Sequence, residues 1–150
     1  MILMDLVNRS PVTVSPVATV AEAARKMKER KVGSVVVVDE GTVVGILTDR
    51  DIAMSIAMGV FEGPDQRVAP LMTRDPICLA SSEDIESGLA TMREHGVRRM
   101  PVLNDDAELV GVVSLDDIVM HMGREMGAAA DLVREEVASR PEDAWPSRNE

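Results

Sequence analysis

One stretch decides the fold of this chain: Gly45-Ile46-Leu47-Thr48-Asp49-Arg50-Asp51-Ile52, in which an apolar strand meets a hydroxyl and then an acid. The pattern returns as Gly111-Val112-Val113-Ser114-Leu115-Asp116-Asp117-Ile118. Each copy has a threonine or serine three residues before an aspartate, which is the spacing of a capping box at the start of a helix. The sequence therefore predicts the same strand-to-helix corner twice.

The two corners belong to a longer internal repeat. Leu6 and Leu71 stand 65 positions apart, and the same offset relates a series of pairs: Pro11 and Pro76, Val20 and Ile85, Ala24 and Leu89, Met27 and Met92, Val32 and Val97, Val37 and Val102. One extra residue in the turn at Asn104-Asp105-Asp106 raises the offset to 66, which relates Gly45 to Gly111. The chain is therefore two copies of one unit, followed by a tail.

Hydrophobic periodicity and turn residues predict the order β-α-β-β-α in each unit. In the first unit we expect strand 12–14, a helix capped by Thr19, strands 35–38 and 42–47, and a helix from Thr48 to about Met58. In the second unit we expect strand 77–79, a helix through Ile85, Leu89 and Met92, strands 100–103 and 108–113, and a long helix after Ser114. Gly88 lies inside a predicted helix, which indicates close packing at that point.

Domain boundaries follow from the repeat. Gly63-Pro64-Asp65 is a turn sequence, so residues 61–67 are predicted to link the two units. The last helix keeps an apolar stripe with helical spacing beyond the second unit: Met122, Met126, Ala129, Val133 and Val137. We assign the first unit to residues 4–60, the second to 68–123, a helical extension to 124–140 and a flexible tail to 141–150.

One unit alone has little core, whereas two units can bury their sheets against each other. The predicted fold class is α+β, with two β-α-β-β-α units packed sheet to sheet about a pseudo-two-fold axis. A cleft between the units is then the natural ligand pocket.

Composition sets limits on compartment and partners. The chain has 150 residues and is 45% hydrophobic and 28% charged, which is ordinary for a globular protein. No apolar run approaches the roughly 18 residues of a membrane span, and Met1-Ile2-Leu3-Met4-Asp5 does not have the pattern of a signal peptide. Cys78 is the single cysteine, so an internal disulfide is excluded. We expect a cytoplasmic protein with no membrane partner.

Charge and aromatic content argue against a nucleic-acid partner. The net charge is −10, which opposes binding by neutralisation of phosphates along a nucleic acid. Phe61 and Trp145 are the only aromatic residues, whereas surfaces that stack on bases need several. A small anionic ligand in a local basic pocket remains compatible with this charge.

No constellation of residues indicates catalysis or metal binding. His95 and His121 are the two histidines, and they lack the spacing of zinc ligands. Neither forms a catalytic pattern with a serine or a cysteine, and Cys78 is predicted to lie inside a strand, buried and unreactive. We therefore expect no enzyme activity, no metal and no required cofactor.

The repeated unit resembles a tandem pair of CBS domains (cystathionine β-synthase domains), which together are called a Bateman module. The resemblance covers about residues 4–123 and is carried by four segments: 45–52, 111–118, His95-Gly96-Val97-Arg98-Arg99-Met100-Pro101-Val102 and Leu71-Met72-Thr73-Arg74-Asp75-Pro76. Such pairs usually sense adenosine-containing ligands, such as AMP, ADP, ATP, NAD or S-adenosylmethionine. The resemblance implies that an adenine nucleotide or S-adenosylmethionine acts as a regulatory ligand of a stand-alone sensor.

Two interpretations of the corner residues Thr48, Asp51, Ser114 and Asp117 remain open. The first is helix capping alone. The second is ligand binding, because a helix N-terminus offers N–H groups to a phosphate and an aspartate accepts hydrogen bonds from vicinal ribose hydroxyls. In the family that the chain resembles, the matching aspartate binds ribose.

Further candidate ligand-binding residues lie on the strands beside the corners. An adenine base needs flat apolar walls and a few backbone hydrogen bonds. The candidates are Thr13, Val14, Val35 and Val36 in the first unit, and Ile77, Cys78, Met100 and Pro101 in the second. A simple core role explains each of these residues equally well.

The two units differ in their capacity for phosphate. The second unit has Arg98-Arg99 where the first has Gly33-Ser34, and arginine forks match phosphate oxygens. At the corner the bias reverses, since Arg50 in the first unit corresponds to Asp116 in the second. An acid beside Asp117 should repel a polyphosphate unless Arg99 or a cation offsets it. We therefore predict two inequivalent sites.

Two roles follow from the resemblance. In the first, a bound adenosine-containing ligand bridges the units and changes their relative angle, which a regulated protein partner or a second copy detects. In the second, the chain is a ligand-free homodimeric interaction scaffold, since the family commonly forms disc-like dimers through the helices that follow the corners. The apolar stripe from Met122 to Val137 would extend such a dimer interface.

Overall fold

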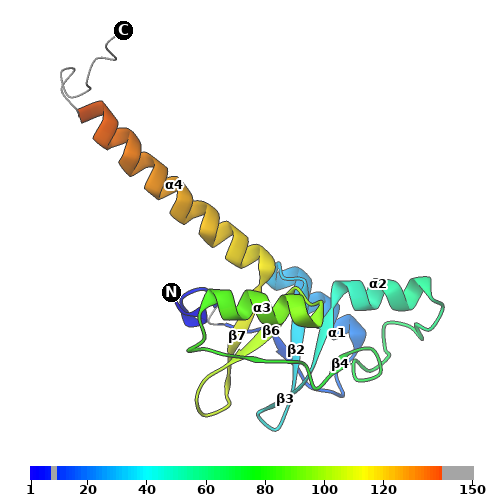
Figure 1. The fold of residues 1–150 in the computed structure, drawn as a ribbon. Coiled ribbons are helices and arrows are strands. Elements are labelled where there is room, and N and C mark those ends of the chain that lie inside the picture. Colours follow the sequence, from blue (N-terminus) through cyan, green and yellow to red (C-terminus); the bar gives the residue numbers. More distant parts are fainter. Residues whose placement is uncertain (8–9, 140–150) are drawn as a thin grey trace.

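The structure of the protein, a computed structural model, describes residues 1–7 and 10–139. The first unit contains β1 (Thr13–Val14), α1 (Val20–Arg30), β2 (Ser34–Asp39), β3 (Thr42–Thr48) and α2 (Asp49–Ala57). The second contains β5 (Leu79–Ala80), α3 (Ile85–His95), β6 (Arg99–Leu103), β7 (Leu109–Ser114) and α4 (Leu115–Ser139). A short 3-10 helix, η1 (Leu3–Asp5), precedes the first unit, and β4 (Thr73–Arg74) lies between the units. The predicted order β-α-β-β-α is confirmed twice (Figure 1).

Strand register repeats as closely as the sequence does. The sheets have the orders β1-β2-β3-β4 and β5-β6-β7, with the first strand of each unit parallel to the second and the hairpin antiparallel. Val14 pairs with Val37 in the first sheet, and Leu79 pairs with Val102 in the second. Both pairs are related by the 65-residue offset, so the repeat in sequence is a repeat in structure.

Local signals explain where the elements of the first unit begin and end. Thr19 caps α1, and its hydroxyl accepts a hydrogen bond from the Glu22 N–H at 3.1 Å. Glu40 and Gly41 have φ values of 49° and 81° in the turn between β2 and β3, as the type I′ turn of a tight hairpin requires. Capping and turn chemistry thus act in the places that the sequence predicts.

The two sheets pack against each other. Alternate residues of a strand point to opposite faces, and Val35 and Val37 of β2 belong to the core of the first unit beneath α1. Val36 and Pro101, which are 65 positions apart, are fully buried and lie outside both core clusters. Their side chains therefore face the opposite sheet, and the predicted α+β fold with a pseudo-two-fold axis is confirmed.

Each unit completes its core with the leading segment of the other repeat. The first core contains Val68, with Leu71 and Met72 packed against it. The second core contains Leu3 and Val7, with Leu6 packed against it. Strand β4 extends the same exchange, because Thr73–Arg74 pairs with β3 of the first sheet. The packing units therefore differ from the sequence repeats at their N-terminal ends.

In the second unit, the structure corrects the predicted start of the first strand and explains the glycine inside the first helix. Strand β5 begins at Leu79, because parallel pairing to β6 starts only there, so Ile77 and Cys78 precede the strand. Gly88 is buried in α3, and a Cβ at this position would lie 3.1 Å from Leu3 Cδ2. The close packing predicted at Gly88 is thus a contact with the exchanged N-terminal segment.

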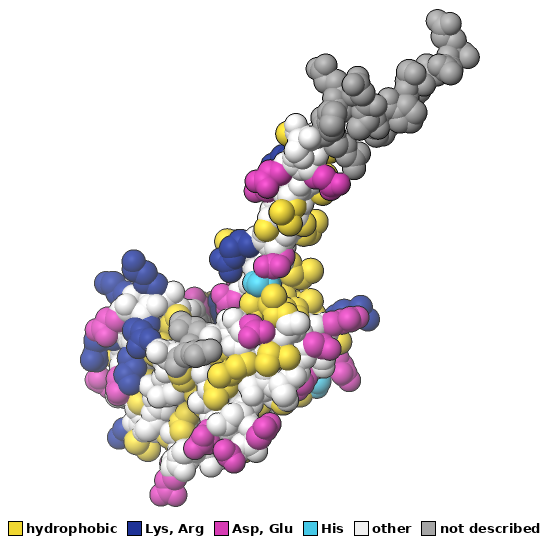
Figure 2. Space-filling view, turned by 90° about the vertical axis from the view of Figure 1, so that its left-hand side faces the viewer, with side chains coloured by type: hydrophobic (Ala, Val, Ile, Leu, Met, Phe, Trp, Pro, Cys, Tyr) yellow, Lys and Arg dark blue, Asp and Glu magenta, His cyan; other side chains and the backbone are white. Residues whose placement is uncertain are grey.

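The last helix, α4, runs for 25 residues and projects from the body of the molecule (Figure 1). Its apolar stripe is exposed, with Met126 at 73% and Val137 at 62% of full accessibility, and Figure 2 shows hydrophobic side chains along it. The tail predicted at 141–150 lies outside the described residues. Within residues 1–7 and 10–139, no helix has both the length and the apolar character needed to cross a membrane.

Candidate ligand-binding clefts

The first corner is a complete capping box at the start of α2. The Thr48 hydroxyl accepts from the Asp51 N–H at 3.1 Å, and Asp51 Oδ2 accepts from the Thr48 N–H at 2.9 Å. Among the described residues, Asp51 Oδ1 has no hydrogen-bond donor. The cap therefore uses one carboxylate oxygen and leaves the other open.

The second corner repeats this geometry at the start of α4. Asp117 N–H donates to the Ser114 hydroxyl oxygen at 3.1 Å, and Ser114 N–H donates to Asp117 Oδ2 at 3.2 Å. The Ser114 hydroxyl also donates to Asp117 Oδ2 at 2.6 Å. In the described part of the chain Asp117 Oδ1 likewise has no donor.

Capping and ligand binding are therefore compatible roles for the same residues. The capping bonds are present at both corners. Each corner still presents an acceptor oxygen, whereas the first N–H groups of α2 are engaged: those of Asp49, Arg50 and Asp51 donate to the Gly33 carbonyl, Asp49 Oδ1 and the Thr48 hydroxyl. At the start of α4 the Leu115 and Asp117 N–H groups donate to the Arg98 carbonyl and the Ser114 hydroxyl. The open carboxylate oxygen can accept hydrogen bonds from a sugar diol.

Each corner opens into a cleft between the units. The Ser114 cleft has a volume of about 410 Å³ and is lined by Ser10, Pro11, Val12, Arg30, Lys31, Val32, Gly33, Ser34, Arg99, Val112, Ser114, Asp116 and Asp117. The Thr48 cleft has a volume of about 440 Å³ and is lined by Ile46, Thr48, Arg50, Asp51, Thr73, Asp75, Pro76, Ile77, His95, Gly96, Val97, Arg98 and Arg99. Both volumes are in the range of small-molecule sites.

The two clefts are related by the sequence repeat. Each combines the corner of one unit with the segment before the first strand and the end of the first helix of the other unit. Equivalent lining pairs include Pro11 and Pro76, Val12 and Ile77, Val32 and Val97, Ser114 and Thr48, and Asp117 and Asp51. Because both units contribute to each cleft, a ligand in either one would contact both units.

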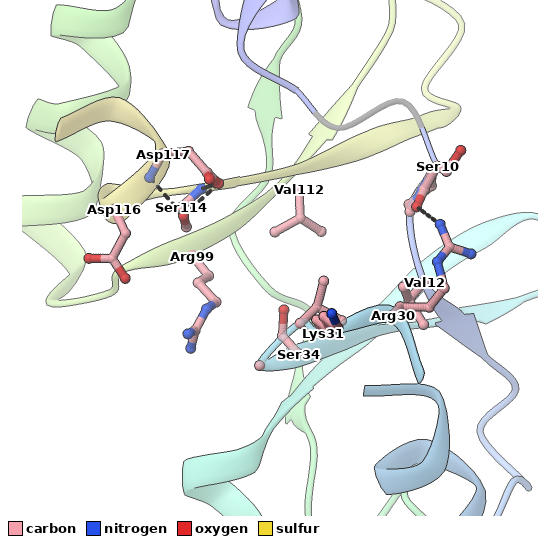
Figure 3. A pocket seen from close by; sticks show the side chains of 13 residues that line it. Ser10, Val12, Arg30, Lys31, Ser34, Arg99, Val112, Ser114, Asp116 and Asp117 are labelled. Atoms are coloured by element: carbon pink, nitrogen blue, oxygen red, sulfur yellow. Dashed lines mark hydrogen bonds between the residues drawn. The ribbon is translucent and has the colours of Figure 1, made fainter. Parts of the chain in front are cut away.

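Apolar side chains line both clefts. In the Ser114 cleft they are Pro11, Val12, Val32 and Val112, and in the Thr48 cleft they are Ile46, Pro76, Ile77 and Val97. Figure 3 shows Val112 on the opposite side of the Ser114 cleft from Lys31 and Ser34, with Arg99 extended between Ser34 and the corner. Apolar side chains beside polar groups suit a flat base attached to a polar sugar.

The charges in the clefts differ in identity. The Ser114 cleft has Arg30, Lys31 and Arg99 as cations and Asp116 and Asp117 as acids. The Thr48 cleft has Arg50, Arg98 and Arg99 as cations and Asp51 and Asp75 as acids. The clefts are thus inequivalent in their charged side chains, as the sequence predicts, although both contain more arginine and lysine than acid.

The negative charge of Asp116 is offset by Arg98, whereas from the sequence we expected Arg99 or a cation to do this. Arg98 Nη2 lies 3.0 Å from Asp116 Oδ1, and the two side chains are 69% and 70% exposed. An exposed ion pair contributes little to stability. The pair nevertheless places the positive charge of Arg98 beside Asp116, the acid that we expect to repel phosphate.

Arg99 occupies the space between the clefts. It lines both of them, and its Nη2 and Cζ atoms lie 2.8 Å and 3.2 Å from the point where a Cβ of Gly33 would stand. The guanidinium therefore rests on the backbone of the first unit although Arg99 belongs to β6 of the second. Glycine at position 33 is what leaves room for it.

The structure brings half of the predicted site residues to the clefts. The residues that line a cleft are Thr48, Asp51, Ile77, Arg98, Arg99, Ser114 and Asp117. Five predicted wall residues are at most 5% exposed and belong to the interior: Val14, Val35, Val36, Met100 and Pro101. Strands covered by helices on one face and by the other sheet on the second have no face left for a ligand. For these five, the core role that the sequence also allowed is the one observed.

Thr13 and Cys78 also lie outside both linings. The Thr13 carbonyl accepts from Lys26 Nζ at 2.9 Å, which ties β1 to α1. The Cys78 thiol donates to the Pro76 carbonyl at 3.4 Å, and partial burial raises the pKa of this thiol. Cys78 is partly rather than fully buried, and it lies just before its strand.

Sequence reasoning missed several cleft residues. They are Ser10, Pro11, Val12, Arg30, Lys31, Val32, Gly33, Ser34, Ile46, Thr73, Asp75, Pro76, His95, Gly96, Val97 and Val112. A usable signal did exist: Lys31 and Gly96 are equivalent, and both end a helix in the left-handed conformation, with φ of 54° and 64°. This turn directs the chain into the cleft before each central strand.

A tandem pair of β-α-β-β-α units with a cleft at each corner defines the class of protein. The family model described as the CBS domain matches residues 3–57 and 68–124. The chain therefore belongs to the CBS domain family, as the repeated motifs predict.

Similar proteins occur in bacteria and archaea. The CBS domain-containing protein YhcV of Bacillus subtilis is 34% identical over 127 residues, which are 84% of this chain and 89% of the relative. Protein MK0525 of Methanopyrus kandleri is 32% identical over 117 residues, 77% of this chain and 59% of the relative. The inosine-5′-monophosphate dehydrogenase of Methanocaldococcus jannaschii is 33% identical over 116 residues, 77% of this chain but 22% of that enzyme. The chain thus spans only part of the length of the last two proteins.

Solved structures share the fold over most of the chain. The CBS domain pair of protein MJ0100, in complex with 5′-methylthioadenosine and S-adenosyl-L-methionine, has a TM-score of 0.75 at 26% identity, over 83% of this chain and 98% of that one. The CBS domain protein PAE2072 from Pyrobaculum aerophilum, complexed with AMP, has a TM-score of 0.71 at 28% identity, over 78% and 89%. The protein ATU1752 from Agrobacterium tumefaciens has a TM-score of 0.74 at 29% identity, over 81% and 99%.

Proposed function

We propose that this protein is a non-catalytic regulatory module that binds an adenosine-containing ligand in the clefts between its two CBS units. The observation that carries this proposal is the geometry of Asp51 and Asp117. Each aspartate caps a helix with Oδ2, has an Oδ1 without a donor among the described residues, and lines a cleft of about 440 Å³ or 410 Å³. A carboxylate oxygen held in this way suits a vicinal diol.

The residues of each cleft can divide the ligand among them. The aspartate accepts from the ribose hydroxyls, and the apolar lining residues contact the base. In the Ser114 cleft Arg30, Lys31 and Arg99 are available for phosphate or another anionic group, and in the Thr48 cleft Arg50, Arg98 and Arg99 are. Complexes of similar CBS pairs with AMP and with S-adenosyl-L-methionine support the choice of ligand class.

A ligand in either cleft would act on the relation between the units. Each cleft is built from both repeats, so a bound molecule would favour the relative orientation in which its contacts to both are made. A regulated protein partner or a second copy of the chain would detect that orientation. The charged surroundings of the clefts favour ligands with an anionic or polar tail on the ribose.

Calorimetric titration of nucleotide-free protein tests the proposal. AMP, ADP, ATP, NAD and S-adenosylmethionine are titrated, with guanosine monophosphate as the control for the base. A ligand at 100 times its dissociation constant adds about 2.7 kcal/mol of stability, which raises the unfolding midpoint of a chain of this size by roughly 5–10 °C. Absence of both heat and midpoint shift with every adenosine compound contradicts the proposal.

A second candidate role is a homodimeric interaction scaffold, and the exposed face of α4 favours it. Met126, Val133 and Val137 are 73%, 59% and 62% exposed on one helical stripe. A continuous apolar stripe on a projecting helix is typical of an interface. If the adenosine compounds fail to bind, and sedimentation shows a dimer that Val133→Glu dissociates while the equally charged Ala138→Glu does not, the scaffold role is favoured.

A further inference from the structure

We propose that the two clefts compete for Arg99, so that an anionic ligand in one cleft lowers the affinity of the other cleft for a second anionic ligand. This inference rests on the proposed function and concerns the regulation of the same sites. It assigns to one arginine the coupling between two otherwise separate pockets.

The position of Arg99 makes it common to both sites. Arg99 pairs with Ser114 across β6 and β7, which puts its backbone at the corner of the Ser114 cleft. Its side chain then crosses to the first unit and rests on Gly33. Of the described residues, Arg99 alone lines both clefts.

The repeat offers no second arginine for this purpose. The equivalent of Arg99 in the first unit is Ser34, which pairs with Thr48 across β2 and β3 and is only 8% exposed. A buried serine is too short to cross between the units. The two clefts therefore share one guanidinium, whereas a protein with identical repeats would have two equivalent arginines or none.

The charges of the two clefts explain why sharing Arg99 affects the binding of anionic ligands. Without Arg99, the Ser114 cleft has Arg30 and Lys31 against Asp116 and Asp117, and the Thr48 cleft has Arg50 and Arg98 against Asp51 and Asp75. By this count each cleft has as many basic as acidic side chains, and the exposed Arg98–Asp116 pair takes one charge from each cleft. Arg99 therefore adds positive charge to the cleft that holds it. A planar guanidinium makes its strongest contact with one anion through two parallel bonds. It cannot do so in both clefts together.

The consequence is a rule for occupancy. The first AMP takes Arg99 into its cleft and leaves the other cleft without an excess of positive charge. Adenosine, which has no phosphate, does not need Arg99 and can fill the second cleft beside AMP. The module then distinguishes two phosphate-bearing ligands from a mixed pair.

A thermodynamic cycle measured by calorimetry with AMP tests this inference. Asp51→Asn and Asp117→Asn each disable one cleft and give the affinity of the other alone. For independent clefts, the overall two-site constant of the wild-type protein equals the product of these two single-cleft constants. We expect the wild-type constant to be at least tenfold weaker than that product. In Arg99→Ser, which restores the symmetry with Ser34, we expect the constant and the product to agree.

Further variants make the test specific to Arg99. Gly33→Ala should displace the guanidinium and reduce the coupling, because its Cβ would stand 2.8 Å from Nη2. Arg93→Ser, which removes the same charge from an exposed position of α3 outside both clefts, should retain the full coupling.

The outcomes separate this inference from the proposed function. Binding in both single-cleft variants, with a wild-type constant equal to their product, overturns the sharing of Arg99 alone. Coupling that persists in Arg99→Ser, or loss of all binding in one single-cleft variant, does the same. Absence of AMP binding in every form, together with absence of binding by the other adenosine compounds, overturns the proposed function and this inference with it.

Discussion

Leu3 and Val68 stand 65 positions apart and exchange places: each is 0% exposed, and each is buried in the core of the unit that the other repeat forms. The exchange is held by equivalent backbone bonds. Leu3 N–H donates to the Glu83 carbonyl at 2.7 Å, and Val68 N–H donates to the Ala18 carbonyl at 2.9 Å. Neither unit has a complete core without a segment from the other repeat.

Truncation of either exchanged side chain should therefore destabilise the whole molecule. We expect Leu3→Ala to lower the free energy of unfolding by about 2–4 kcal/mol, and Val68→Ala by a smaller amount, because each leaves a cavity in a packed core. Urea unfolding followed by circular dichroism should show a single transition at a lower midpoint. Val17→Ala, at a site 64% exposed, is the control and should change stability by less than about 0.5 kcal/mol. Two separate transitions in Leu3→Ala would contradict the interlocked arrangement.

The aspartates should show their ligand role through the ribose hydroxyls. Asp51→Asn keeps an oxygen that can accept from the Thr48 N–H, so its fold should remain intact. A hydrogen bond to a charged group contributes about 1.5–3 kcal/mol, so we expect adenosine affinity at the Thr48 cleft to fall by roughly 10–100-fold. Titration with 2′-deoxyadenosine in the Asp117→Asn background, in which the Thr48 cleft is measured alone, is the decisive comparison, because the added Asp51→Asn change should make binding insensitive to the missing hydroxyl. Equal discrimination by variant and wild type would show that Asp51 does not bind ribose.

Local chemistry explains why so much of the fold could be predicted. Thr48 and Asp51 form their cap within one turn of chain, and Glu40 and Gly41 form their hairpin turn in the same local way. Because the sequence repeats, each helix and strand is predicted from two copies of its pattern, and two weak patterns in register support the same prediction. The exchange of Leu3 and Val68 was not foreseen, because it depends on contacts between segments far apart in the sequence.

The site was predicted only in part for a related reason. The corner aspartates carry a local signature, so they were found. Val35, Val36 and Met100 fit an apolar wall and a core equally well, and burial on both faces of a strand depends on what covers it. The contact between the Arg99 guanidinium and Gly33 joins two units, so neither residue by itself predicts this contact.

The Cys78 thiol should make stability depend on pH. Burial raises its pKa in the folded protein above that of the unfolded chain, which is about 8.5. The folded protein thus holds the thiol proton more tightly, so its contribution is fully present below about pH 8.5 and is lost as the pH rises through the folded pKa. We expect the wild-type protein to lose more stability than Cys78→Ala between pH 8 and pH 10. Iodoacetamide should also alkylate the folded protein at pH 8 more slowly than the urea-unfolded chain. An equal rate would contradict the raised pKa.

Lys31 stands where glycine would fold better. It ends α1 with φ 54° and ψ 44°, whereas the equivalent position in the second unit is Gly96 with φ 64°. The left-handed conformation costs a residue with a Cβ about 1–2 kcal/mol, and part of this is offset by the greater flexibility of unfolded glycine. Lys31→Gly should therefore raise the free energy of unfolding by about 0.5–1 kcal/mol.

The same substitution should weaken the Ser114 cleft, because Lys31 is one of its cations. We expect AMP affinity in the Asp51→Asn background to fall several-fold, with a weaker dependence on salt. Lys28→Gly is the control: it removes an equal charge from an exposed position in the last turn of α1, should lower stability by up to about 1 kcal/mol, and should leave AMP affinity nearly unchanged. A more stable but weaker-binding Lys31→Gly would mean that the lysine is retained for its charge in the cleft. A less stable variant with unchanged affinity would assign Lys31 to the fold and leave the anion to Arg30 and Arg99.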